Sequence, residues 1–388
     1  MNQLSDLKSR KDTILLLLLG LFSFGGATGR FLLGFALFDI ILVTLVCYSL
    51  IRFKGTIGLV DFKIIIILSL LIALGIISSQ FGRSPDGYSY FITEVRFYLY
   101  LPMIYFISMT FRFSLDYLEK ILPVILVVYM LIWGLLLTPG SLLFRFFNTG
   151  FVSSIGDHLR INGPHVLILQ PILLLLLYKK PVKSMIIILY SILIFLIFIK
   201  TGGRTYFIYY SIPLVFLMFK WRKNYKLVVL PIILLITSII LVKELTSQVF
   251  FERLLKVFSV TEDTSFMYRF YNITAMIKHF SGKILLIGYG IGSAYNFELF
   301  DMHTNFFLDN TFVTLIYKVG IIGLSAFLWI FVYEKSIIPI QVYLFELAGL
   351  ILVGTLSYHL ILNPVFLFGY FLVFNYFKNT HNLKKVLE

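Results

Sequence analysis

Acidic and imidazole side chains near the start of an apolar segment are the first candidates for chemistry. Asp309 and Asn310 lie about one turn into an otherwise apolar run, and His303 comes shortly before them. An acidic residue at membrane depth is costly and usually marks a functional site. Asp309 or His303 could act as a general base toward an alcohol nucleophile. The alternative is a helix N-terminus that is merely stabilised by acidic residues.

Two further segments combine arginine and glycine in an arrangement that suits an anionic ligand. Arg160 opens the run Arg-Ile-Asn-Gly-Pro-His, which ends at His165, and Arg204 follows Gly203 in the run Thr-Gly-Gly-Arg. Glycine and proline at a helix start leave backbone amides that can face an anion. The alternatives are an ordinary capped helix entry for the first segment and a tight interhelical turn for the second. We take Arg160, His165, Gly203, Arg204 and Asn310 as candidate binding residues.

Later in the chain, Arg269 stands in a Tyr-Arg-Phe run, and glycines follow at 288, 290 and 292. No βαβ pattern surrounds these glycines, so they do not form a dinucleotide fingerprint, and we expect a plain turn. Glu94 and Arg96, two residues apart where an apolar run begins, are interpreted as an interface pair without a catalytic role.

The elements that must position these residues are membrane helices. The chain is 59% hydrophobic and 13% charged, whereas soluble domains are about 25% charged. Its apolar runs are long enough to cross a hydrocarbon core of about 30 Å, and they lack the alternation of barrel strands. We expect an all-α, polytopic inner-membrane bundle of about twelve helices, with 1–388 as one integral membrane domain. The expected spans are 13–29, 31–51, 63–80, 97–111, 119–138, 165–178, 184–199, 205–219, 227–243, 306–332, 337–354 and 356–377.

Loop charges indicate the orientation. Lysine and arginine are enriched in the loops that face the cytoplasm when both termini are placed there, so the net charge of +14 does not imply a nucleic-acid partner. The first apolar run resembles a signal peptide, but a second follows at once, so we expect an uncleaved first helix. The one large loop, 244–305, lies between helices nine and ten and is expected to be periplasmic. Most arginines also fall on the outer side, where their guanidinium groups suit phosphate oxygens: Arg30, Arg83, Arg96, Arg145, Arg160, Arg204, Arg253 and Arg269.

These segments, in this order, resemble the O-antigen polymerase (Wzy-type) and O-antigen ligase superfamily of membrane glycosyltransferases. The resemblance covers nearly the whole chain. It is carried by the segment from Arg160 to His165, the Thr-Gly-Gly-Arg turn ending at Arg204, Arg269, the later glycines, and the run Gly320-Ile321-Ile322-Gly323. One position departs from the family pattern: spacing places aspartate, at Asp309, where a histidine is common. This departure favours a polymerase over a ligase.

The resemblance implies inverting glycosyl transfer at the outer face of the inner membrane, from an undecaprenyl-diphosphate-linked glycan to another lipid-linked repeat unit. Arg160, Arg204 and Arg269 would then hold the diphosphate, and Asp309 or His303 would act on the acceptor hydroxyl. The alternatives are a ligase that transfers polymer to lipid A core, and a lipid-linked oligosaccharide flippase. The family makes a chain-length regulator a further possible partner.

No cofactor or metal is expected, because the chain lacks an HExxH motif, paired cysteine ligands and a Walker motif.

Overall fold

The computed structural model describes these residues: 11–14, 30–32, 35–53, 57–81, 88–111, 114–136, 152–155, 158–161, 168–201, 204–220, 229, 273–274, 277, 282–293, 310–356 and 364–387. The described chain is mainly α-helical, as expected, and contains in addition two short antiparallel hairpins. It divides into two compact units, which we describe separately.

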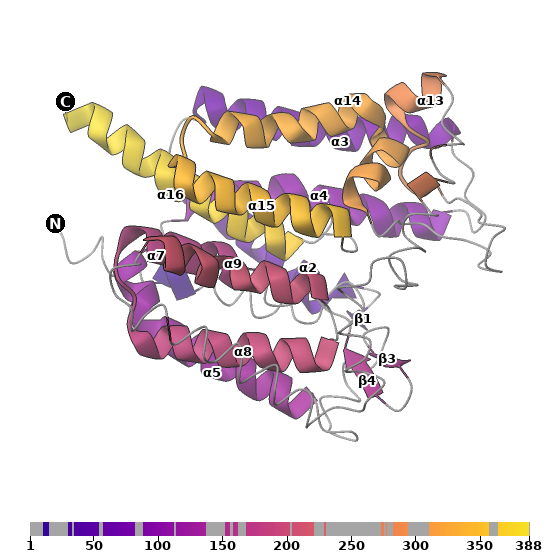
Figure 1. Ribbon diagram of the computed structural model, residues 1–388. Coiled ribbons are helices and arrows are strands. Elements are labelled where there is room, and N and C mark those ends of the chain that lie inside the picture. Colours follow the sequence, from indigo (N-terminus) through magenta and orange to yellow (C-terminus); the bar gives the residue numbers. More distant parts are fainter. Residues whose placement is uncertain are drawn as a thin grey trace. The chain divides into compact units, whose positions relative to one another are not determined.

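Unit 1 comprises Met1–Cys47 and Phe111–Ser259. Helix α5 packs against α8, and α9 packs against both α7 and α8. The helix α2 (Leu37–Arg52) runs from this unit into the next. The elements of unit 1 are β1 (Arg30–Leu32), β2 (Phe35–Ala36), α5 (Leu115–Leu136), β3 (Val152–Ile155), β4 (His158–Ile161), α7 (Leu169–Lys179), α8 (Ser184–Thr201) and α9 (Arg204–Lys220) (Figure 1).

A surface ion cluster joins the start of α5 to the loop between α7 and α8. The Lys180 ammonium donates to Asp116 Oδ1 at 2.7 Å and lies 2.6 Å from Glu119 Oε2. The hydrogen bond from Lys180 and its positive charge lower the pKa of Asp116, and the hydrogen bonds to Asp116 and Glu119 raise the pKa of Lys180. The cluster therefore keeps Asp116 charged to a lower pH, and Lys180 charged to a higher pH, than their ordinary pKa values would.

Unit 2 comprises Tyr48–Thr110 and Val260–Glu388. Helix α3 packs against α4 and α14, and α4 also packs against α16. The short helix α13 contacts both α14 and α3, and Figure 1 shows it beside α14. The elements are α3 (Leu59–Ser78), η2 (Ser79–Phe81), α4 (Tyr88–Thr110), α13 (Gly282–Ile287), α14 (Thr311–Glu334), α15 (Ile340–Leu356) and α16 (Pro364–Leu387).

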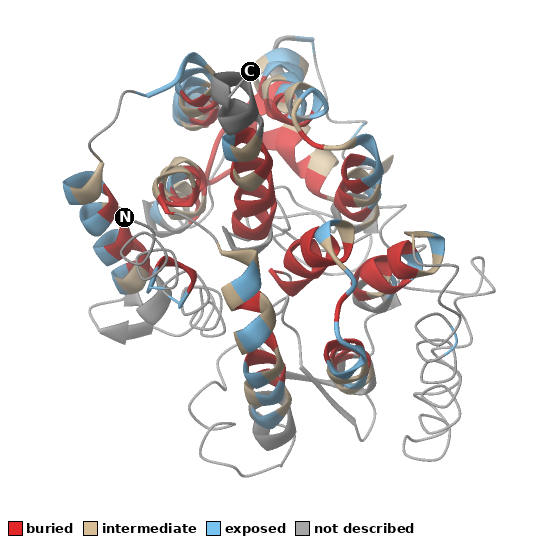
Figure 2. Ribbon diagram, turned by 90° about the vertical axis from the view of Figure 1, so that its left-hand side faces the viewer, coloured by how far each residue is buried: buried red, intermediate tan, exposed pale blue. Residues whose placement is uncertain are grey.

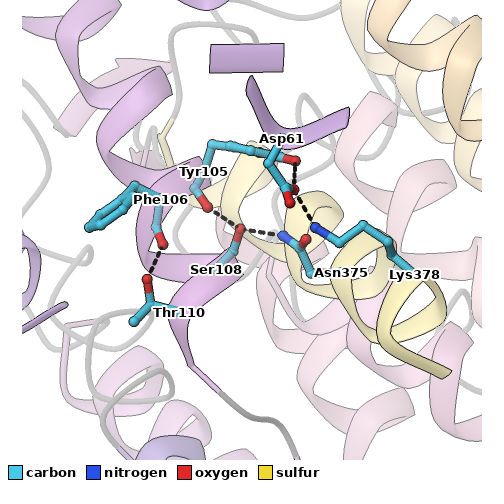
Figure 3. A network of polar contacts seen from close by, with 7 residues as sticks. All are labelled: Asp61, Tyr105, Phe106, Ser108, Thr110, Asn375 and Lys378. Atoms are coloured by element: carbon cyan, nitrogen blue, oxygen red, sulfur yellow. Dashed lines mark hydrogen bonds and ion pairs between the residues drawn. The ribbon is translucent and has the colours of Figure 1, made fainter. Parts of the chain in front are cut away.

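A buried polar network ties the start of α3 to α4 and α16 (Figure 3). Asp61 Oδ1 accepts hydrogen bonds from the Tyr105 hydroxyl, at 2.7 Å, and from the Lys378 ammonium. One turn away, the Asn375 amide donates to Ser108 Oγ at 2.8 Å. Because an apolar helix face fixes axial register only weakly, these directional contacts set how the three helices align.

Two helices, Leu59–Ser78 and Thr311–Tyr333, are long and apolar enough to cross a membrane, as judged over the described residues alone. Shorter apolar helices accompany them at Leu169–Lys179, Ser184–Ile197, Ile208–Lys220 and Ile340–Leu352. In Figure 2 many helices carry buried residues on one side and exposed residues on the other. Large apolar side chains are among the exposed ones, such as Ile51 at 81% and Val332 at 65%. Apolar groups on an outer surface fit a lipid environment better than water.

The observed helices correct several expected boundaries. The span expected at 31–51 begins with the β1–β2 hairpin and becomes helical only at Leu37. The span expected from 97 begins at Tyr88, because the polar residues that were assigned to a loop belong to α4. Pro171 lies in the first turn of α7, where proline is tolerated. The spans expected at 13–29 and 227–243 lie almost entirely outside the described residues.

Candidate functional site

In unit 1 the structure places two of the expected arginine segments at one end. Arg160 lies on β4 and is paired with Ser153 of β3 in an antiparallel hairpin. Arg204 is the first residue of α9. Strand β4 contacts α8, and the hairpin lies beyond the end of α8 at which α9 begins (Figure 1). The backbone of this unit therefore brings the two segments together, although they are about 40 residues apart in the sequence.

In unit 2 the candidate Asn310 is the N-cap of α14. Its backbone is extended, and its side-chain Oδ1 accepts a hydrogen bond from the Val313 amide at 3.1 Å. The Thr314 amide and hydroxyl both donate to the Asn310 carbonyl. Asparagine is among the preferred residues at this position because its side chain satisfies an amide that the helix leaves unpaired. The other expected site residues, His165, Gly203, Arg269, His303 and Asp309, lie outside the described residues.

The glycine-containing turn, residues 288–293, is where the structure departs most from the sequence-based expectation. A plain turn was expected, but Gly288, Gly290, Gly292 and Ser293 are buried. Gly290 has a φ of +91°, and a Cβ there would meet the backbone of Ser78 and Ser79 in the end of α3. Only glycine allows the chain to pass this closely in that conformation. The turn therefore packs inside unit 2, directly against the end of α3.

Helix α14 is interrupted at Gly320, whose φ of 69° and ψ of −175° are not helical. Such a break deprives the preceding carbonyls of their usual partners four residues on. The glycine-containing turn supplies replacements, since the Tyr289 amide donates to the Tyr317 carbonyl at 2.7 Å and the Gly290 amide donates to the Lys318 carbonyl at 2.9 Å. A broken helix in an apolar environment requires such replacement partners.

The turn also uses the end of α3. The Ile291 amide donates to the Gly75 carbonyl at 2.9 Å, and the Ser78 hydroxyl donates to the Ile287 carbonyl at 2.6 Å. The last carbonyls of a helix lack partners within that helix. The turn therefore provides hydrogen-bond donors for backbone carbonyls of two helices, α3 and α14.

A buried ion pair completes this region. Lys318 of α14 has no exposed surface, and its ammonium donates to Glu94 Oε2 of α4 at 2.9 Å. The same ammonium donates to the Ser293 carbonyl at 2.5 Å, and the Gly292 amide donates to Glu94 Oε2 at 2.5 Å. Two side chains from different helices and two backbone groups from the turn therefore meet at one point.

This pair corrects the interpretation of Glu94 and Arg96 as an interface pair. Glu94 is 2% exposed and binds Lys318. The sequence does carry a signal for this site: a lysine within an apolar span needs a partner, and Lys318 is such a lysine. Its partner lies 224 residues away, and local sequence cannot identify it.

Residues 189–328 match the sequence model of the Wzy_C family, described as O-antigen ligase. This match supports a relationship of the chain to the O-antigen ligase and polymerase superfamily. No curated protein matches the chain.

The O-antigen ligase match includes most of α8, all of α9, the glycine-containing turn and the greater part of α14. It therefore covers Arg204, Asn310 and Lys318, whereas Arg160 and Glu94 precede it. Members of this superfamily are glycosyltransferase-like enzymes. Among the described residues, no group of three or more histidine, cysteine, aspartate or glutamate side chains is placed to hold a metal ion.

Proposed function

We propose that this protein is a polysaccharide polymerase of the bacterial inner membrane that joins undecaprenyl-diphosphate-linked repeat units. The observation that carries the proposal is the family match over 189–328 together with the arrangement of unit 1, in which the segments of Arg160 and Arg204 lie at one end. Two arginine-bearing segments at one end of a helical unit suit a diphosphate, because guanidinium groups bind phosphate oxygens in a fork geometry.

The proposed reaction is an inverting glycosyl transfer. A hydroxyl oxygen of the acceptor sugar attacks the anomeric carbon of the donor, while the bond from that carbon to the lipid diphosphate breaks. The diphosphate leaves with the bonding electron pair, and Arg160, Arg204 and Arg269 stabilise its charge. Asp309 or His303 takes the proton of the attacking hydroxyl. The lipid diphosphate is itself a good leaving group, so the step needs neither a nucleotide nor a metal.

Two contacts are consistent with the sidedness that the charge rule assigns, because each joins segments that the rule places on the same, cytoplasmic side. The Lys180 cluster joins the two loops that the charge rule places on the cytoplasmic side. The Asp61–Lys378 contact joins the start of α3 to α16 near the C-terminus, two segments with the same expected side. The glycine-containing turn and Asn310 then belong to the periplasmic side, where the lipid-linked glycan would bind. A chain-length regulator is a further proposed partner.

The proposal is tested by supplying purified full-length protein with lipid-linked repeat units and separating the products by gel electrophoresis. Wild-type protein should produce a ladder of polymers. Arg204→Ala should lower turnover by about 10²- to 10³-fold, as loss of one group that stabilises transition-state charge usually does. Arg52→Ala, at the end of α2, is the matched control and removes the same charge without affecting turnover.

A ladder that Arg204→Ala leaves unchanged would remove Arg204 from the diphosphate site. Absence of a ladder from wild-type protein with native substrate would refute the polymerase.

A ligase is the second candidate, because the matching family is described as O-antigen ligase. The same assay separates the two when lipid A core is added as acceptor: a ligase attaches glycan to lipid A core, whereas a polymerase lengthens the lipid-linked chain. A flippase would move the lipid-linked glycan across vesicles and form no glycosidic bond.

A further inference from the structure

We propose that Glu94 and Lys318 are positioning residues that hold the glycine-containing turn against the broken helix α14 and so place Asn310 for glycosyl transfer. The inference deepens the proposed function and rests on it. Neither residue is assigned a direct contact with substrate.

The pair joins three elements of unit 2. Lys318 belongs to α14, and Glu94 belongs to α4. Through Glu94 Oε2 and the Lys318 ammonium, the pair also holds the Gly292 amide and the Ser293 carbonyl of the turn. One ion pair thus connects α4, α14 and the turn.

Lys318 lies in a half-helix that can move as one piece. The break at Gly320 separates residues 311–319 from the rest of α14. This half-helix is about 14 Å long, because each residue adds about 1.5 Å. It is held on one side by the turn, through the carbonyls of Tyr317 and Lys318. A shift at Lys318 therefore moves the whole half-helix, with Asn310 at its far end.

Stability alone does not explain the pair. A buried ion pair is often no more stabilising than apolar residues of the same size. In addition, Glu94 Oε1 is buried and accepts no hydrogen bond from the residues that the structure describes, so its desolvation is not compensated there. We infer that the pair is kept because it fixes the positions of α4, α14 and the turn relative to one another.

Unit 2 contains its own control. The Asp61–Lys378 pair is also buried, but it ties α3 to α16 at the other end of α3, away from the turn. Breaking either pair leaves a buried charge without its partner. Only breaking the Glu94–Lys318 pair is expected to release the turn.

The experiment compares Glu94→Gln and Lys318→Met with Asp61→Asn and Lys378→Met in the full-length protein. Turnover of lipid-linked repeat units gives kcat and KM, and hydrogen exchange followed by mass spectrometry reports on the peptides covering 288–293 and 311–319. Glu94→Gln should lower kcat by about 10- to 100-fold, the usual effect of a misplacement of about 1 Å. KM for the donor should change by less than about twofold, since a positioning residue acts on the reacting geometry.

Exchange of both peptides should become faster in Glu94→Gln and remain at the wild-type rate in Asp61→Asn. Asp61→Asn should lower thermal stability at least as much and leave kcat unchanged. Lys318→Arg keeps the charge and serves as the conservative variant: it should recover part of the kcat that Lys318→Met loses. It also replaces Lys318→Met should that protein fail to fold.

Equal loss of kcat in Glu94→Gln and Asp61→Asn would reduce the pair to a structural role and overturn the proposal. Unchanged exchange of 288–293 in Glu94→Gln would also overturn it. Wild-type protein that forms no glycosidic bond would refute the proposed function instead, and the exchange rates would still decide whether the pair holds the turn.

Discussion

Replacing Gly290 with alanine tests whether the turn depends on close backbone approach. Gly290 has a φ of +91°, which costs an alanine about 1–2 kcal/mol. The added Cβ would meet the backbone of Ser78 and Ser79, so the turn must move away from α3. That movement breaks the hydrogen bonds from Gly290 to Lys318 and from Ile291 to Gly75, each with a net value of about 1 kcal/mol.

Together these effects amount to about 3–4 kcal/mol against the closed turn. Since every 1.4 kcal/mol is a factor of ten, protection of the amides in 288–293 against hydrogen exchange should fall by roughly two to three orders of magnitude. Mass spectrometry of the peptide covering this turn, in the full-length protein, measures the change.

Gly282→Ala is the matched control. Gly282 begins α13, and no atom lies within 4 Å of a Cβ added there. We expect the same turn peptide to exchange at the wild-type rate in this variant. If Gly290→Ala also retained wild-type protection, the turn would accommodate a side chain, and the reasoning from φ and backbone contact would be wrong.

Three further predictions concern single contacts. Asn310→Ala should lower the free energy of unfolding by about 1 kcal/mol through loss of the helix cap, whereas Asn310→Asp should retain stability in thermal unfolding. Lys180→Met should lower the melting temperature at neutral pH. The difference in melting temperature between this variant and wild type should vanish as the pH falls below 3.8. The reason is that Lys180 lowers the pKa of Asp116, so the contact stabilises only while Asp116 is ionised; a difference that persists in acid would contradict this. Asp61→Asn should lower the free energy of unfolding by about 3–5 kcal/mol because Lys378 stays buried without its carboxylate, and denaturant unfolding measures the loss.

Long apolar runs predicted several helices well, because in a membrane protein the length of such a run is itself the structural signal. The span expected at 184–199 is helix α8, Ser184–Thr201, and the span expected at 205–219 is α9, Arg204–Lys220. The prediction failed where apolar composition does not distinguish conformations. Residues 30–32 and 35–36 continue the apolar pattern of α2, yet they form the paired strands β1 and β2.

The start of α4 was misplaced for a different reason. Glu94 and Arg96 look like loop residues when the sequence is read locally, since isolated charges in an apolar helix are costly. The cost is offset by Lys318, which is far away in the sequence. Local patterns therefore reveal that a charge needs a partner but not which residue provides it.

In the candidate site, too, the sequence identified some residues, whereas their contacts became apparent only in the structure. Sequence spacing singled out Arg160, Arg204 and Asn310, and the structure places the first two segments at one end of unit 1 and makes the third a helix cap. The role of the glycine-containing turn was missed, because its partners are backbone carbonyls that become available only when α14 breaks at Gly320. A glycine inside an apolar helix is compatible with either a straight or a broken helix, so sequence alone does not predict the break.

The polar contacts of unit 2 lie at the two ends of α3, and this placement follows from the physics of apolar helices. Helix α3 spans 20 residues, about 30 Å. Its middle is apolar, and in lipid such a surface gains little from burial against another helix, so it can slide or rotate at low cost. Asp61 fixes the start of α3 to α4 and α16, and the turn fixes its end through Gly75 and Ser78. Because both ends are held by directional hydrogen bonds, α3 provides a fixed support against which the broken half of α14 is set.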